Sequence, residues 1–141
     1  MSVKTILSLA IVVVLSSFTP DTDIIGEWKL DQKTVDKTVK GAIERVDKAN
    51  PAMASQVDNN KEVVVEMVQA LRMNFKADHT FNMQSKERKQ SGKWNFINNG
   101  HELRIISTDG KLRKDSVLEI TATRMVLINK KLSDTIVYIR P

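Results

Sequence analysis

Few residues in this sequence have the types and spacing that chemistry requires. The two histidines, His79 and His101, fall near different predicted hairpin turns. A metal ion would need both turns to meet beside carboxylates such as Asp78 or Glu102. The chain has no cysteine, which removes thiolate ligands, disulfides and a cysteine nucleophile. We therefore expect no metal site.

The hydroxyls and the remaining carboxylates do not suggest a reaction centre either. Ser91 and Ser116 lack a sequence context that would activate a hydroxyl. Asp21 and Asp23 precede the first predicted strand, and Glu119 lies on a strand whose opposite face is apolar, so it should point to solvent. There is no glycine-rich phosphate loop. The sequence therefore predicts a protein that is not an enzyme and uses no cofactor.

Residues 1–20 have the pattern of a secretion signal. Lys4 supplies a positive charge, residues 6–15 form an apolar run, and small residues follow it. A helix over that run would be about 15 Å long, which is half of a hydrocarbon core, so we expect no membrane span. Without a cysteine there is no site for a lipid anchor. We expect residues 21–141 to be exported as a soluble periplasmic or extracellular domain.

The charge balance is basic, with 22 lysines and arginines against 17 aspartates and glutamates. Most of the positive charge lies in predicted turns, at Lys86, Arg88, Lys89, Lys111, Arg113, Lys114, Lys130 and Lys131. These side chains either are solvated hairpin tips or attract an anionic envelope surface. Export, and the scarcity of aromatic residues near these charges, argue against a nucleic-acid partner.

Hydrophobic periodicity divides the rest of the chain into a strand, a helical stretch and a run of strands. Residues 24–31 alternate between apolar and polar side chains, which is typical of a strand with one buried face. From 32 to about 69 the apolar residues recur every three or four positions, as on one face of a helix. Asn50 and Pro51 are residue types preferred where a helix begins, so this insert should contain more than one helix.

Alternation resumes near residue 70 and continues to the end of the chain. It predicts seven strands joined by short turns, including Asn99-Gly100 and Asp109-Gly110, whose residues tolerate positive φ. The first strand makes eight. We expect a mainly β fold, an eight-stranded antiparallel up-and-down barrel with the helical insert between its first and second strands. A twisted open sheet packed against the helices is the competing arrangement.

Two Gly-x-Trp stretches fit the interior of such a barrel. Gly26 precedes Trp28 in the first predicted strand, and Gly92 precedes Trp94 in a later one. In each stretch the indole would point inward, and the glycine two residues earlier would let another strand pass closely.

These features resemble the lipocalin-like barrels of the calycin group. The likeness covers residues 24–141 and rests on "IIGEWKL", the eight-strand meander and the closing "TIVYIR". In that group the first-strand Gly-x-Trp lies at the closed end of the barrel, where an arginine of the last strand packs across the indole. The resemblance therefore implies structural closure by Gly26, Trp28 and Arg140.

A partial likeness to the fatty-acid-binding barrels is also present. Those carriers have a helical lid after the first strand, and they hold the ligand carboxylate with an arginine two residues before a tyrosine on the last strand. Tyr138 matches the tyrosine, but Ile136 occupies the arginine position, which argues against that mode of recognition. The nearer resemblance is to the small lipocalin-like domains of secreted bacterial proteins.

The barrel interior is the remaining candidate site. The predicted ligand-binding residues are Met73, Phe75, Phe81, Met83, Phe96, Leu118, Met125 and Tyr138. They would suit a small lipophilic molecule oriented by the tyrosine hydroxyl, but the same side chains could simply fill the barrel. We expect either a non-catalytic lipid-binding protein or an envelope protein-interaction domain with a filled core. The second would act through its basic hairpin tips or its helical insert, and the insert could be a lid, a plug or a partner surface.

Overall fold

A computed structural model describes residues 20–141, so the predicted secretion signal lies outside the described residues apart from Pro20. A short helix, α1 (Pro20–Asp23), and the strand β1 (Gly26–Leu30) are followed by the helices α2 (Gln32–Ala49), α3 (Ala54–Asn59) and α4 (Lys61–Gln69). A short 3-10 turn, Pro51–Met53, joins α2 to α3. The remaining strands are β2 (Arg72–Phe75), β3 (Thr80–Gln84), β4 (Lys89–Ile97), β5 (Glu102–Ser107), β6 (Leu112–Ile120), β7 (Arg124–Asn129) and β8 (Asp134–Ile139).

The eight strands form one closed barrel in sequence order, and neighbouring strands are antiparallel. The last strand returns to the first, where Lys29 pairs with Ile139 and Leu30 with Tyr138. Closure pairs the two strands that would be exposed edges in an open sheet. The predicted eight-stranded barrel with a helical insertion is therefore confirmed, and the competing open sheet is wrong.

The tight turn between β4 and β5 follows from its residue types. Gly100 has a φ of 84°, in the left-handed region that glycine adopts without steric cost. Asn98 and Asn99 also lie in that region, with φ of 53° and 56°. Asparagine visits it more readily than most residues because its short polar side chain can bond locally. The Asn-Asn-Gly sequence therefore permits the reversal that the strand pattern requires.

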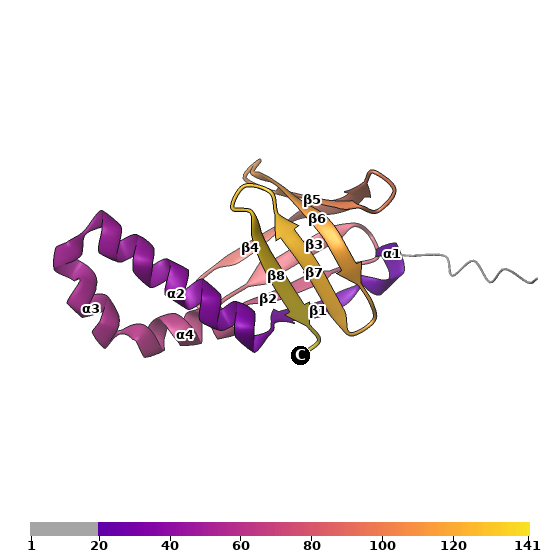
Figure 1. Ribbon diagram of the computed structural model, residues 1–141. Coiled ribbons are helices and arrows are strands. Elements are labelled where there is room, and N and C mark those ends of the chain that lie inside the picture. The colour runs from indigo at the N-terminus through magenta and orange to yellow at the C-terminus, as the bar shows by residue number, and fades with distance from the viewer. Residues whose placement is uncertain (1–19) are drawn as a thin grey trace, which may run out of the picture.

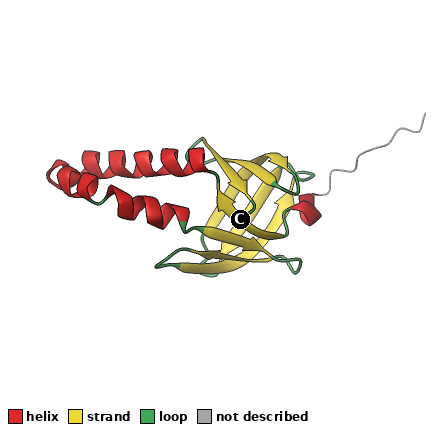
Figure 2. Cartoon of the chain, turned by 90° about the horizontal axis from the view of Figure 1, so that it is seen from below, coloured by secondary structure: helices red, strands yellow, loops and turns green. Residues whose placement is uncertain are grey.

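The antiparallel order sorts the connections to the two ends of the barrel. Helix α1 and the turns β2–β3, β4–β5 and β6–β7 lie at one end, which we call the closed end. The turns β3–β4, β5–β6 and β7–β8 lie at the other end with both connections to the helices, and we call this end the mouth. Figure 2 shows α1 and the three longer helices on opposite sides of the barrel.

Helices α2, α3 and α4 form an arm that extends away from the barrel (Figure 1). The arm begins where the Asp31 carboxylate accepts a hydrogen bond of 2.8 Å from the backbone N–H of Thr34. The Thr34 hydroxyl in turn accepts one of 3.1 Å from the Val137 N–H of β8, which fixes the start of α2 to the barrel wall. Farther out, Val39 faces Val65 of α4 across a shared hollow. The arm therefore covers its apolar stripe largely with its own helices and is not a plug. No helix within residues 20–141 is both long enough and apolar enough to cross a membrane.

The hydrophobic core lies inside the barrel. Its fully buried apolar side chains are Trp28, Trp94, Phe75, Phe81, Ile24, Leu103, Met125 and Leu127. Both Gly-x-Trp glycines lie where another group comes close. A Cβ on Gly92 would be 2.0 Å from the backbone oxygen of Ile106, and a Cβ on Gly26 would be 2.8 Å from Nη1 of Arg140. The obstacle at Gly92 is backbone, and at Gly26 a φ of 114° would strain any other residue, so each indole lies beside a position that requires glycine.

Candidate functional site

Arg140 covers the closed end of the barrel. Its Cζ lies 3.7 Å from the centroid of the Trp28 ring. Its guanidinium donates hydrogen bonds to the backbone oxygens of Ala122 at 2.9 Å, Glu27 at 3.1 Å, Asp23 at 2.8 Å and Ile25 at 3.0 Å. One side chain thus joins α1, β1 and the β6–β7 turn. The Arg140 side chain therefore covers Trp28 and ties together the segments at this end of the barrel.

The histidines do not form a metal centre with the carboxylates considered above. His79 stacks on Trp94 with 4.5 Å between ring centroids, and its Nδ1 lies 3.1 Å from the Trp94 backbone oxygen. Its backbone φ of 64° places it in the β2–β3 turn as a packing residue. Within residues 20–141, no three histidine, aspartate or glutamate side chains come together in a way that could hold a metal ion.

Most of the predicted ligand-binding residues face the barrel interior. Those that are buried in the core are Met73, Phe75, Phe81, Met125 and Tyr138. Met83 and Phe96 are partly buried and pack against the same core. The side chains are therefore together in space, and the large rings among them lie next to one another. Phe75, for example, meets Trp94 edge to face at 5.8 Å between centroids.

Leu118 is the exception, and the prediction for its face was wrong. It lies outside the barrel with 60% of its surface exposed. The cause is a register shift between Val117 and Glu119 in the pairing of β6 with β7, which is a β-bulge. The extra residue inverts the alternation, so the residues before the bulge that face inward are Val117 and Asp115.

The same bulge brings in two charged residues that the sequence reasoning missed. Arg113 was predicted to lie in a basic hairpin tip, either solvated or facing an anionic surface, but it pairs with the inward-facing Ile105 and shares its face of the sheet. Asp115 is 0% exposed. No pattern in the sequence indicated the bulge, because Ser116, Leu118 and Ile120 continue the alternation without a break.

Arg113, Asp115 and Tyr138 form a polar cluster at the edge of this apolar interior, in which Asp115 and Tyr138 are buried and Arg113 is half-buried. Nη2 of Arg113 lies 2.6 Å from Oδ2 of Asp115 and donates a hydrogen bond of 3.4 Å to the Tyr138 hydroxyl. Burial of the guanidinium lowers the pKa of Arg113, but electrostatic attraction and hydrogen bonding to Tyr138 and Asp115 outweigh burial and raise it above its ordinary value. Arg113 is therefore held in its charged form.

The hydrogen-bonding capacity of this cluster is not filled. Among the described residues, Nε of Arg113 and Oδ1 of Asp115 are buried without a hydrogen-bond partner, while Oδ2 of Asp115 is ion-paired with Arg113. Buried polar groups in folded proteins are nearly always paired with protein or with an ordered molecule. The cluster can therefore donate to, and accept from, a polar group that enters the barrel.

A hollow of about 430 Å³ opens beside Arg113 at the mouth. It is lined by Leu112, Arg113 and Lys114 of β6 and by Asn129, Lys130 and Lys131 at the end of β7. Arg113 is the member of this set that also belongs to the interior cluster. The guanidinium is therefore the link between the mouth and the buried carboxylate.

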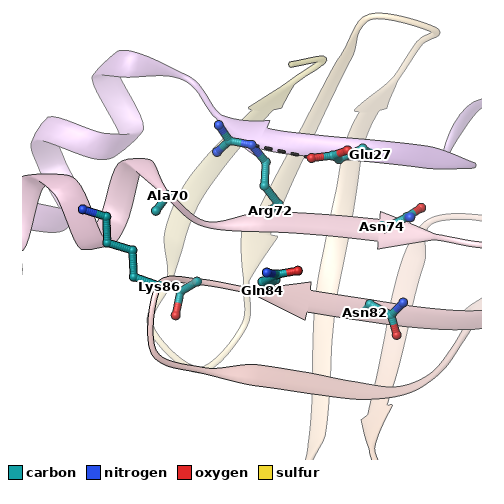
Figure 3. Close-up of a pocket in the computed structure, with 8 residues that line it drawn as sticks. Glu27, Ala70, Arg72, Asn74, Asn82, Gln84 and Lys86 are labelled. Atoms are coloured by element: carbon teal, nitrogen blue, oxygen red, sulfur yellow. Dashed lines mark ion pairs between the residues drawn. The ribbon is translucent and has the colours of Figure 1, made fainter.

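A second hollow, of about 460 Å³, lies on the outer face of β1, β2 and β3 (Figure 3). Asn74, Asn82 and Gln84 lie side by side there, while Nε of Arg72 is 3.6 Å from Oε1 of Glu27. Its lining is made of amides and charges that point away from the core. This surface does not suit a lipophilic molecule.

The predicted basic hairpin tips lie at the mouth, and some of their charge is already paired. Lys86 of the β3–β4 turn lies 2.6 Å from Glu66 of α4, which fastens that turn to the arm and lowers the pKa of the Glu66 carboxyl. Lys130 forms an ion pair with Glu102, whose side chain is almost completely buried. These two lysines therefore have structural partners.

Comparison with solved structures shows two proteins with a similar fold. A DUF4847 family protein from Bacteroides vulgatus superposes with a TM-score of 0.54 at 12% identity, over 84% of this chain and 94% of that one. A lipocalin-like protein from Bacteroides uniformis superposes with a TM-score of 0.51 at 13% identity, over 84% of this chain and 99% of that one. Identities this low show a shared fold alone.

At the level of sequence, no curated protein matches the chain. The family model of the lipocalin-like domain matches residues 24–127, from the strand that carries the first Gly-x-Trp to β7. The match covers most of the barrel, including the helical arm. Together with the closed eight-stranded barrel, it shows that this chain belongs to the lipocalin-like domain family.

Proposed function

We propose that this protein is an exported, non-catalytic binding protein for a small lipophilic molecule that enters the barrel at the mouth. The observation that supports this is the Arg113–Asp115–Tyr138 cluster. Asp115 and Tyr138 are buried in an apolar interior and Arg113 is half-buried, and Nε of Arg113 and Oδ1 of Asp115 have no hydrogen-bond partner among the described residues. A barrel that served only as a scaffold would gain more from an apolar residue at these positions.

The charge of the cluster favours a neutral polar group on the ligand. Asp115 already balances the charge of Arg113, so a ligand carboxylate would meet a negative charge beside the positive one. A hydroxyl or an amide can donate to Oδ1 of Asp115 and accept from Nε of Arg113 at the same time. The ligand is therefore an apolar molecule that carries a hydroxyl or amide, with Tyr138 orienting that group.

The apolar part of the ligand would lie against the flexible side chains near the mouth. Leu30 ends β1 beside Tyr138, and Met83 lies near the end of β3; both are partly buried against the core. Methionine adapts its shape at small cost because it is unbranched. Each Å² of apolar surface that the ligand buries there contributes about 25 cal/mol.

The test compares three long-chain probes of equal length: a primary alcohol, a fatty acid and an alkane. Binding is followed by tryptophan fluorescence and native mass spectrometry. The alcohol should bind most tightly to the unmodified protein. Asp115→Asn leaves the Arg113 charge unbalanced and should change the preference toward the fatty acid by at least about tenfold. Tyr138→Phe removes one hydrogen bond and should weaken alcohol binding about fivefold.

Leu118→Ser is the matched control, because Leu118 lies on the outer face of the same strand as Asp115. It should leave all three affinities unchanged. The proposal fails if the protein binds none of the probes and carries no molecule when it is purified from its host. It fails equally if Asp115→Asn is folded and keeps the original order of affinities.

Export is part of the proposal and has its own test. We propose that residues 1–20 direct secretion and are removed, leaving residues 21–141 as the working domain. Intact-mass measurement on protein from the host should give a chain that starts between 17 and 21. A full-length chain found with the cytoplasmic fraction would contradict export.

A second candidate is an envelope protein-interaction domain with a filled core, and the arm favours it. The arm extends from the barrel and exposes Met53, Val63 and Met67 (Figure 1). If the arm binds a partner, Met67→Lys should abolish co-isolation of one envelope protein, while Leu118→Lys on the barrel should not. If both variants co-isolate the same amount of the envelope protein, the arm is not the surface that binds it.

A further inference from the structure

The β5–β6 and β7–β8 turns lie side by side at the mouth (Figure 1). They bring together two leucines and four lysines, which we call the mouth patch: Lys111, Leu112, Lys114, Lys130, Lys131 and Leu132. The two halves of the patch come from separate hairpins that are joined by the shared hollow described above. The patch is therefore a product of the barrel closure rather than of one sequence segment.

The two leucines of the mouth patch are strongly exposed. Leu112 is 54% exposed at the start of β6, and Leu132 is 61% exposed in the β7–β8 turn. A single exposed leucine on a protein surface is ordinary. Here two exposed leucines lie on or beside neighbouring turns, and each is next to a lysine in the chain, so exposed apolar and cationic side chains occur together at the mouth.

The lysines of the mouth patch keep most of their charge available. In the described part of the chain, no carboxylate lies within 4.0 Å of the ammonium group of Lys114 or Lys131. Lys111 lies 3.6 Å from Asp109, and both side chains are well exposed to solvent, where such a pair is weak. Of the four lysines, Lys130 is the one that forms an ion pair with a buried carboxylate, that of Glu102.

We propose that the mouth patch docks this protein onto an anionic lipid bilayer. Leu112 and Leu132 enter the headgroup region, and Lys111, Lys114 and Lys131 lie at the level of the lipid phosphates. Exposed apolar side chains with a lysine rim are the combination that binds an anionic membrane surface without spanning it. Docking does not depend on what the barrel binds.

The experiment measures co-sedimentation with vesicles of phosphatidylcholine alone or mixed with phosphatidylglycerol. The protein should bind the mixed vesicles and leave pure phosphatidylcholine largely unbound, and added salt should release it. Each lysine near an anionic surface strengthens binding about fivefold, so the double variant Lys114→Glu/Lys131→Glu should bind at least about 25-fold more weakly. Leu132→Ser should weaken binding about fivefold.

Leu118→Ser is again the matched control, since Leu118 is as exposed as Leu132 but lies on the side of the barrel. It should bind as the unmodified protein does. Equal binding to both vesicle types, full binding by the double lysine variant, or equal losses in the two leucine variants would each overturn the proposal. No binding to either vesicle type would overturn it as well, and would leave an acidic protein as the kind of partner to seek for these lysines.

Discussion

Replacement of Arg140 by alanine should destabilise the barrel more than any other single change at a solvent-accessible arginine. Its guanidinium packs 3.7 Å from the Trp28 ring centroid and donates to four backbone oxygens. Alanine would remove all five interactions and leave the closed end without a cover. The four carbonyls would then need water as their partner.

The loss in the free energy of unfolding can be estimated from how exposed each Arg140 contact is. A cation over an indole contributes about 0.5–2 kcal/mol. The bond to the Asp23 oxygen is partly buried, and a hydrogen bond from a charged group there is worth about 1.5 kcal/mol or more. The three other bonds are exposed, so water replaces most of their value. We expect Arg140→Ala to lower the free energy of unfolding by about 3 kcal/mol.

Urea denaturation followed by tryptophan fluorescence measures this loss. Arg124→Ala is the control, because Arg124 forms an exposed ion pair of 2.8 Å with Glu119 and should cost less than about 1 kcal/mol. Arg140→Lys should recover only a small part of the loss, since an ammonium cannot span four carbonyls. A loss at Arg140→Ala no larger than the Arg124→Ala loss would refute the reasoning. Reduced probe binding at unchanged stability would show that Arg140 belongs to the ligand site instead.

Four further predictions concern the stability of the protein. Gly92→Ala should lower the free energy of unfolding by about 3 kcal/mol, because its Cβ would be 2.0 Å from a backbone oxygen of β5. Gly41→Ala, on α2 with nothing within 4 Å, should raise it by about 0.5–1 kcal/mol. Equal effects in urea denaturation would contradict both. Lys130→Glu puts a second carboxylate beside the buried Glu102 and should cost about 2 kcal/mol in the same assay; unchanged stability would show that the pair contributes nothing. Hydrogen bonds from the hydroxyl and N–H of the threonine two residues later lower the pKa of Asp78, so its contribution to stability is complete above about pH 4 and is lost as the pH falls through the lowered value. A titration by NMR that gives Asp78 an ordinary or raised pKa would contradict this.

The strand pattern and the turn residues were sufficient for the fold class. Period-two alternation marks strands because successive side chains point to opposite faces, and that rule acts within a few residues. Asn99 and Gly100 likewise specify a reversal through their own φ preferences. The two Gly-x-Trp stretches, Gly26 to Trp28 and Gly92 to Trp94, indicated indole rings that point into the barrel and glycines that let a neighbouring group come close. These are local properties, and the sequence by itself determined them.

The same local rules could not predict the residues of the proposed ligand site. Strict alternation put Leu118 inside and treated Arg113 as a solvated tip, whereas the bulge after Val117 reverses both assignments. Whether a strand bulges depends on how its neighbours pair and on which side chains the core can accommodate, and neither is encoded in a single strand. The partner of Arg113 on β8, Tyr138, is 25 residues away in the chain.

The position of the arm and the mouth patch were also decided by tertiary structure. The helical stripe of α2 predicted burial, but it could not say whether the barrel or the other helices would supply the cover. In the sequence, Lys111 and Lys114 belong to one predicted turn, and Lys130 and Lys131 belong to another. Closure of the barrel places these two turns together at the mouth. Local sequence determined which elements form, and long-range pairing decided which of their side chains meet, because contact between distant segments depends on the register of every strand between them.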